Sequence, residues 1–232
     1  MPTTARKTSR YRDKHEAANG VRVFTIRPKT ENQSRLLSVI EDYEIVIALG
    51  PAGTGKTYCS AAKVAQLYQG GLYDKIILAR SIIPTGKSMG YLPGDVKEKL
   101  RPWLLPMLSV LEKAFGKNKY EAMYAKGDID LQPLETIRGR SYENSLIMVD
   151  ECQNLDFEEI KAITTRLGEG SKMILMGDTF QSDIKGSSSI LKFSNMCNRH
   201  DLEIPVVQFD ADDIVRSDIV GKLVRMFMKE AK

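Results

Sequence analysis

The stretch IVIALGPAGTGKT, residues 45–57, is the strongest indication of the fold in this sequence. Its first part, Ile45–Leu49, is a short apolar run typical of a buried strand, and the second is the pattern Gly-x-x-x-x-Gly-Lys-Thr. A glycine-rich turn between a strand and a helix is the setting of a phosphate-binding loop. The glycines let backbone N–H groups turn inward around phosphates, and the following helix presents its positive N-terminus to them.

This loop supplies the first candidate site residues. Lys56 would reach the β- and γ-phosphates of a nucleotide, and the Thr57 hydroxyl would bind Mg²⁺. The loop that would surround the phosphates consists of Gly50, Pro51, Ala52, Gly53, Thr54, Gly55, Lys56 and Thr57. A chance glycine-rich turn is the alternative, and the strand before the loop and the helix after it argue against that alternative.

Apolar runs of similar length recur along the chain and predict the rest of the sheet. Besides Ile45–Leu49 they cover residues 75–79, 145–149, 172–176 and 205–209. Runs that are apolar throughout predict strands covered on both faces by helices. Helices are expected at residues 57–68, about 95–115, 156–167, 187–196 and 217–229. The expected class is α/β, a doubly wound, largely parallel sheet that binds ligands beyond the carboxyl ends of its strands.

Two prolines interrupt the second of these helices. Pro102 and Pro106 predict either two short helices or one kinked helix, because proline removes a helical hydrogen bond. The large apolar side chains between and after them are expected in the core or in a subunit contact, and the sequence leaves both open. They are Trp103, Leu104, Leu105 and Leu108.

The run SLIMVDECQN places two adjacent carboxylates, Asp150 and Glu151, directly after a strand. Asp150 would steady Mg²⁺ through its water shell, and Glu151 would polarise the attacking water as general base. The alternative is an acidic pair at a helix N-terminus, where it would stabilise the helix and do no chemistry. The apolar strand directly before the pair favours hydrolysis.

Two glutamines and an aspartate complete the candidate site. In MGDTFQ, after the strand at 172–176, Gln181 would sense the γ-phosphate or its water, and Asp178 would extend the Mg²⁺ shell. Gln33 either reads the adenine edge or belongs to a solvated helix start. The stretch NKYE, residues 118–121, has Glu where a guanine-reading motif needs Asp, which favours ATP over GTP.

The charge of the chain is concentrated at its start. The formal net charge is +4, and residues 1–22 hold six basic side chains against two acidic ones, so they carry all of it. Such a segment is typical of a solvated, flexible tail and less often of an arm that contacts phosphates. We therefore expect a tail at 1–22 and one domain at 23–232. No apolar run nears the ~20 residues that span a membrane, so we expect a soluble, cytoplasmic protein.

Seven motifs, taken in order, resemble the PhoH family of phosphate-starvation-inducible ATPases over residues 26–227. They are PKTENQ, GPAGTGKTY, LARSIIPTGKSMGYLPGD, IRGR, VDECQN, MGDTFQSDI and DIVRSDIV. The resemblance implies a RecA-like P-loop NTPase domain similar to the motor cores of superfamily 1 helicases, assembled as a hexameric ring. It assigns nucleotide roles to Gln33, residues 50–57, Asp150, Glu151 and Gln181, and an interface role to Arg216. Cys152 and Ser217 depart from the family's usual Ala and His. Short members of this kind are common in bacteriophages, in which case the host cytoplasm is the expected location.

The expected function is a Mg²⁺-dependent ATPase that acts as a ring-forming, helicase-like motor on RNA or single-stranded DNA. A single RecA-like domain lacks the second domain that supplies an arginine to the γ-phosphate, so that arginine would come from another subunit. The alternative is an ATP-driven remodeller or switch that acts on a protein partner without nucleic acid. Four basic side chains either contact a nucleic-acid backbone or form salt bridges: Arg80, Lys87, Arg138 and Arg140.

Overall fold

The computed structural model describes residues 24–80, 96–137, 139–178 and 188–230. The expected tail at 1–22 lies outside these residues, and so do three candidate side chains, Lys87, Arg138 and Gln181. None of the helices in the described part of the chain has both the length and the apolar composition needed to cross a membrane.

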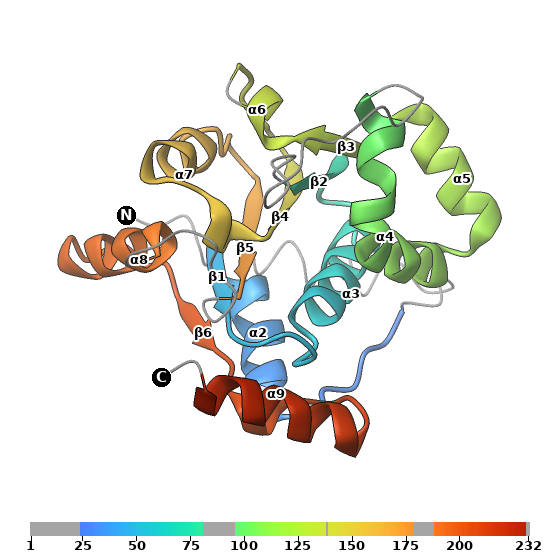
Figure 1. Cartoon of the computed structure of the whole chain (residues 1–232). Coiled ribbons are helices and arrows are strands. Elements are labelled where there is room, and N and C mark those ends of the chain that lie inside the picture. Colours follow the sequence, from blue (N-terminus) through green and yellow to red (C-terminus); the bar gives the residue numbers. More distant parts are fainter. Residues whose placement is uncertain (1–23, 81–95, 138, 179–187, 231–232) are drawn as a thin grey trace.

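Six parallel strands form one sheet, which confirms the expected fold class (Figure 1). The strands are β1 (Ile45–Leu49), β2 (Lys75–Arg80), β3 (Ile129–Pro133), β4 (Ser145–Asp150), β5 (Lys172–Gly177) and β6 (Val206–Gln208). Their order across the sheet is β3-β2-β4-β5-β1-β6. The five expected runs are all strands, and β6 and β3 form the two edges. Strand β3 was not expected from the sequence.

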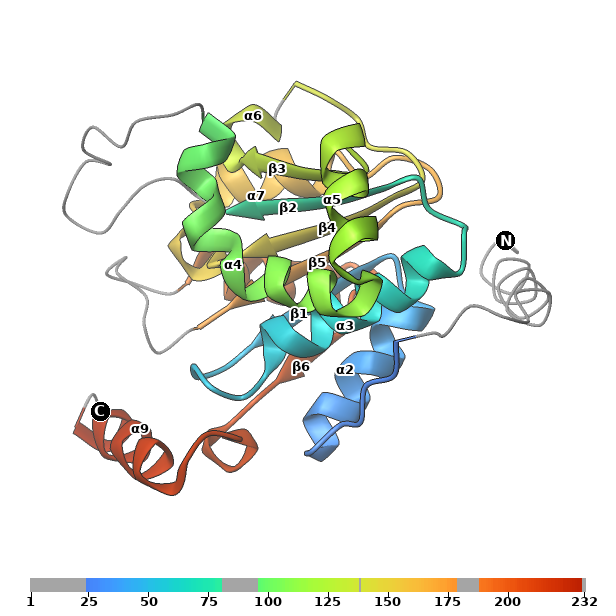
Figure 2. The ribbon, with the colours of Figure 1, turned by 90° about the vertical axis from the view of Figure 1, so that its right-hand side faces the viewer.

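Helices cover both faces of the sheet (Figures 1 and 2). The helices of the described residues are α2 (Glu31–Asp42), α3 (Lys56–Gln69), α4 (Val96–Phe115), α5 (Lys117–Lys126), α6 (Leu134–Ile137), α7 (Phe157–Thr164), α8 (Ser189–Arg199) and α9 (Asp218–Glu230), of which α9 extends away from the sheet. Side chains of α2, α3 and α4 join one apolar cluster, and those of α7 and α8 join the other. Strand residues alternate between the clusters: Ile76 belongs to the first and Ile77 to the second. Burial on both faces explains why the strands are apolar throughout.

The stretch with two prolines forms the single helix α4, not two short helices. Pro102 and Pro106 lie four residues apart on the exposed side of the helix, where water can satisfy the carbonyl groups that lose a partner. Leu104 and Leu108 are buried in the core. Trp103 and Leu105 remain 45% and 50% exposed.

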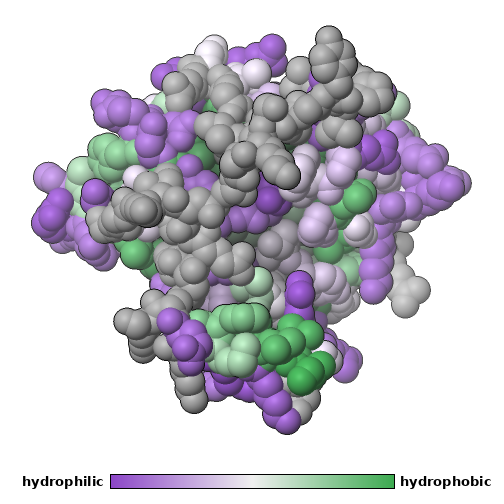
Figure 3. Space-filling model, in the orientation of Figure 1, coloured by the Kyte–Doolittle hydropathy of each residue, from purple (hydrophilic) through white to green (hydrophobic). Residues whose placement is uncertain are grey.

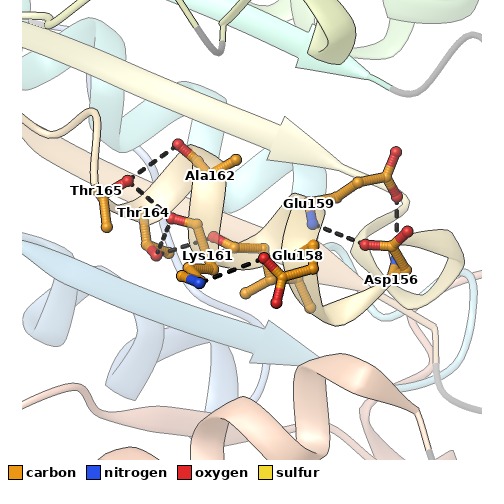
Figure 4. A network of polar contacts seen from close by, with 8 residues as sticks. Asp156, Glu158, Glu159, Lys161, Ala162, Thr164 and Thr165 are labelled. Atoms are coloured by element: carbon orange, nitrogen blue, oxygen red, sulfur yellow. Dashed lines mark hydrogen bonds and ion pairs between the residues drawn. The ribbon is translucent and has the colours of Figure 1, made fainter.

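The parallel register brings the carboxyl ends of the strands to one edge. Arg80 at the end of β2 pairs with Asp150 at the end of β4, and Leu49 of β1 pairs with Gly177 of β5. After β4 the chain makes a 3-10 turn, Cys152–Asn154, before α7 begins. A capping box fixes that beginning (Figure 4): the backbone N–H of Glu159 donates to Asp156, and the backbone N–H of Asp156 donates back to Glu159.

Candidate active site

The loop between β1 and α3 has the backbone that its glycines predict. Gly53 and Gly55 have φ angles of 88° and 85°, in the left-handed region that other residues avoid. A Cβ atom on Gly55 would lie 2.8 Å from Nε2 of Gln33, so the close contact with α2 also requires glycine. The first turn of α3 follows directly at Lys56, and its free N–H groups therefore point into the loop.

Lys56 is held at the centre of this loop. Its ammonium group donates hydrogen bonds to the carbonyl oxygens of Gly50 at 2.7 Å and of Pro51 at 2.8 Å. Burial lowers the pKa of Lys56, and the nearby carboxylates of Asp178, then Asp150 and Glu151, oppose that shift. The lysine of the loop thus lies within electrostatic reach of the acids at the ends of β4 and β5.

The acidic pair follows β4 as the sequence predicts, and each member has a defined partner. Arg80 approaches both acids: its Nη2 lies 3.1 Å from Oε1 of Glu151, and its Nη1 lies 3.7 Å from Oδ2 of Asp150. Burial and the neighbouring Glu151 raise the pKa of Asp150 to about 6, while Arg80 opposes the shift. Glu151 has a φ of 58°, unusual for a residue other than glycine, which turns the chain sharply at the end of the strand.

Gln153 is a site residue that the sequence analysis did not identify. Its side-chain N–H donates to Oε2 of Glu151, and its Oε1 accepts a hydrogen bond of 2.9 Å from the backbone N–H of Asp178. The side chain is almost fully buried, and it joins the ends of β4 and β5. A Cβ atom on Gly177 would lie only 3.0 Å from the same Oε1, so a small residue at that position allows the contact. Gln153 is part of the motif VDECQN and lies two residues after Glu151, so its place in the sequence could have identified it.

Gln33 is buried rather than solvated, and it supports the loop. Its Nε2 donates to the carbonyl of Thr54 at 2.9 Å, and its Oε1 accepts from the backbone N–H of Lys29 at 2.8 Å. Helix α2 begins beside it, with Thr30 as the N-cap. The structure therefore gives Gln33 a positioning contact with the phosphate-binding loop, and contact with a base stays a prediction.

Arg216 lies against the loop of its own chain. The backbone N–H of Val215 donates to the carbonyl of Gly53 at 3.1 Å. A Cβ atom on Gly53 would lie 3.0 Å from Cδ and 3.1 Å from Nε of Arg216. The same segment is tied to α2, because Asn32 donates to the Asp213 carboxylate at 2.8 Å. The sequence predicts an arginine that acts across an interface, and this position also lets Arg216 act within one chain.

Of the four basic side chains that were expected to contact either nucleic acid or acidic partners, two belong to the residues that the structure describes. Arg80 is engaged by Asp150 and Glu151, so the salt-bridge alternative holds for it. Arg140 is exposed and lines a separate polar pocket together with Lys75 and Ser145, the first residues of β2 and β4.

Mg²⁺ fits this site only if a nucleotide shares it. Among the described residues, no group of three or more His, Cys, Asp or Glu side chains is arranged to hold a metal ion. Mg²⁺ commonly takes one or two carboxylates and completes its shell with phosphate oxygens and water. Burial, and then the adjacent Glu151, raise the pKa of Asp150, so a cation at this carboxylate would offset a charge that is costly to bury. Thr57, in the first turn of α3, is the hydroxyl on the phosphate side.

The sheet order and this site define the class of protein. Strand β5 lies between β1, which carries the phosphate-binding loop, and β4, which carries the acidic pair. This is a RecA-like P-loop NTPase domain. A family model described as "PhoH-like protein" matches residues 25–228, and the chain belongs to the PhoH family.

Known relatives agree with that assignment. The chain is 36% identical over 207 residues to a PhoH-like protein of Bacillus subtilis, covering 89% of this chain and 65% of the relative. It is 44% identical over 168 residues to Protein PhoH2 of Bacillus subtilis, covering 69% of this chain and 38% of the relative. It is 33% identical over 205 residues to Protein PhoH of Escherichia coli, covering 87% and 58%. The chain thus spans less than two thirds of the length of these relatives.

Among solved structures, the chain is similar to the UvsW helicase of bacteriophage T4, with a TM-score of 0.49 and 13% identity over 85% of this chain and 67% of that one. It is similar to the large terminase of a thermophilic bacteriophage, also with a TM-score of 0.49, at 12% identity over 86% of this chain and 50% of that one.

Proposed function

We propose that the protein is a Mg²⁺-dependent ATPase. One observation carries this proposal: the ammonium group of Lys56 lies in the phosphate-binding loop and within electrostatic reach of Asp150 and Glu151. Phosphate binding and water activation therefore have their residues at one edge of the sheet. ATP is favoured over GTP because the sequence lacks a guanine-reading motif, and Gln33 is proposed to contact the base.

Each side chain has a separate part in the proposed reaction. Lys56 and the N–H groups of the loop bind the β- and γ-phosphates and offset the charge that develops there. Glu151 accepts a proton from the attacking water. Thr57 and Asp150 would hold Mg²⁺, which supplies a Lewis acid next to the phosphates. Gln181, outside the described residues, is proposed to sense the γ-phosphate.

Two substitutions separate binding from hydrolysis. Lys56→Ala should lose ATP binding, because the loop loses its positive charge. Glu151→Gln should bind ATP within about threefold of the wild type yet lose at least ~100-fold in turnover, because general bases contribute about 10²–10⁴-fold. Equilibrium dialysis with labelled ATP and a phosphate-release assay measure the two properties.

The matched control for these variants is Glu158→Gln, on the exposed surface of α7. It should behave as the wild type in both assays. Undiminished hydrolysis in Glu151→Gln would remove Glu151 from the role of general base.

We propose that the protein forms a homo-oligomer, and the PhoH resemblance implies a hexameric ring. Helix α9 supports self-assembly because one of its faces is apolar and exposed (Figure 3, over α9 of Figure 1). The exposed apolar side chains on it are Ile219, Leu223, Met226 and Phe227. Their spacing places them together on one side of a helix. A contiguous apolar face of this kind marks a protein contact more often than open surface.

RNA or single-stranded DNA is the proposed substrate, by similarity to superfamily 1 motor cores and by the net charge of +4 in residues 1–22. A protein partner is the alternative. The three cysteines are buried free thiols, which fits the reducing cytoplasm as the proposed location. The rate of ATP hydrolysis with and without polynucleotide distinguishes the two substrates.

A further inference from the structure

Arg80 occupies a position between the acidic pair and the surface of the protein. It ends β2, beside Asp150 in the neighbouring strand β4. Its Nη2 lies 3.1 Å from Oε1 of Glu151, and its Nη1 lies 3.7 Å from Oδ2 of Asp150. Only 22% of its side chain is exposed, so solvent screens these ion pairs weakly. In this state Arg80 offsets part of the negative charge of the two acids.

The same guanidinium group contacts helix α4. Its central carbon lies 5.5 Å from the ring centroid of Trp103, which is within the range of a cation–π contact. Its Nη1 also donates to the carbonyl of Trp103 at 3.3 Å. Trp103 is 45% exposed, and the sequence contains one tryptophan. Arg80 therefore connects the catalytic acids to an exposed aromatic side chain through direct contacts on both sides.

Binding of Mg²⁺ and a nucleotide would change the charges on one side of this connection. In the proposed function Asp150 belongs to the Mg²⁺ shell, and Arg80 already approaches the same carboxylate. Mg²⁺ held at Asp150 would compete with the guanidinium group for that carboxylate, because both are cations that its negative charge attracts in a poorly solvated site. Glu151 and the Trp103 ring remain available to Arg80 on its other sides.

We propose that Arg80 is a positioning residue that links the acidic pair to Trp103: it pairs with Asp150 and Glu151 in the nucleotide-free protein and moves from Asp150 toward Trp103 when Mg²⁺ and nucleotide bind. The inference rests on the proposed function, because it requires nucleotide at the loop. By reciprocity, a contact made at Trp103 would alter how Arg80 holds Glu151. The link thus gives the active site a route to the outer surface of α4.

The emission of Trp103 tests this link without an activity assay. Indole fluorescence responds to a charge that moves near the ring, and one tryptophan makes the signal unambiguous. The protein is titrated with Mg²⁺ and a non-hydrolysable ATP analogue, and binding of a labelled form of the analogue is measured separately by equilibrium dialysis. We expect an emission change in the wild type that saturates with the binding curve.

Three variants identify the residue responsible. Compared with the wild type at saturating analogue, with occupancy checked by dialysis, Arg80→Gln should lose most of the emission change, because the moving charge is gone. Arg80→Lys should keep part of the change. Arg101→Gln is the matched control: Arg101 is also an arginine over an aromatic ring, since it lies on α4 with its guanidinium carbon 5.4 Å from the ring of Tyr124 on α5. It should respond as the wild type.

The outcomes separate this inference from the proposed function. A full emission change in Arg80→Gln, or bound analogue with no change in the wild type, would overturn the link. Failure of the wild type to bind the analogue in dialysis would overturn the proposed function and the inference with it. A thermal melting curve of each variant establishes that it is folded under the conditions of the fluorescence measurement.

Discussion

Asp150 is ionised at neutral pH only at a cost, since its burial and the adjacent Glu151 raise its pKa from an ordinary 3.8 to about 6. Between these two values the folded protein binds more protons than the unfolded chain, so its stability falls as the pH rises through that window. Above about pH 6 the carboxylate is ionised in both states, and the folded protein bears the whole free-energy cost of burying its charge. The nucleotide-free protein therefore carries a destabilising carboxylate where the proposed Mg²⁺ would offset its charge.

Replacing this carboxylate should stabilise the nucleotide-free protein. Asp150→Asn is expected to raise the free energy of unfolding at pH 7.5 by about 1–3 kcal/mol, since each pKa unit corresponds to about 1.4 kcal/mol. The gain should shrink near pH 4, where the wild-type side chain is protonated in the folded state. Urea denaturation at both pH values measures it.

The control for this measurement is Glu158→Gln, whose side chain is 75% exposed. It should change stability little at either pH. A less stable Asp150→Asn at pH 7.5 would show that the ion pair with Arg80 outweighs the cost of burial.

At the scale of single residues, the sequence motifs predict the positions of those candidate site residues that come directly before or after a strand. Lys56, Asp150 and Glu151 lie where the loop and the apolar run predict. The partners of Glu151 could not be predicted, because they depend on tertiary structure. Arg80 reaches it only because β2 and β4 are neighbours in a particular register, and Gln153 reaches it through a sharp turn at a left-handed residue.

At the scale of elements, the strands apolar throughout were predictable and the edge strand β3 was not. In β3, Asp130 and Gln132 alternate with buried Ile129 and Leu131, and the strand is short and ends at a proline. Alternation of this kind is weak over five residues. Helix α2 was likewise not assigned, although Leu36 is buried on it at helical spacing. The prolines in α4 left two short helices or one kinked helix open, because their solvent-facing position was unknown.

The segment between β6 and α9 determines how Arg216 acts. Because Val215 is hydrogen-bonded to Gly53 of the same chain, we expect Arg216 to serve the nucleotide bound by its own chain. Lys56→Ala and Arg216→Ala subunits should each be nearly inactive. Mixed oligomers that contain both should stay inactive, because each chain lacks one of two groups that must act together.

Two affinity tags on the mixed subunits establish co-assembly before the ATPase rate is compared with that of the separate variants. Oligomers of wild-type and Lys56→Ala subunits provide the positive control. Recovered activity in the mixture of the two variants would instead show action across the interface, as the sequence resemblance implies. Near-normal activity of Arg216→Ala alone would remove its catalytic role.

At the scale of the whole molecule, the parallel sheet gathers the loop, the acids and Arg80 at one edge. Helix α9 extends away from the sheet beside that edge, with its apolar face exposed (Figures 2 and 3). The candidate active site therefore adjoins both a surface suited to contact with another subunit and, through Arg80, the exposed face of α4. With these neighbours the proposed ATPase can pass the state of its nucleotide to other molecules, and we propose that single-stranded nucleic acid is one of them.

The most direct test of that claim is the rate of ATP hydrolysis by the wild-type protein with RNA, single-stranded DNA, duplex DNA or no polynucleotide, each at two salt concentrations. We predict that single strands raise the rate several-fold, and that the increase fades at the higher salt concentration because phosphate contacts release counterions. Glu151→Gln should stay at least ~100-fold below the wild-type rate under all of these conditions. A wild-type rate that is the same with and without polynucleotide at both salt concentrations would contradict the claim and favour a protein partner.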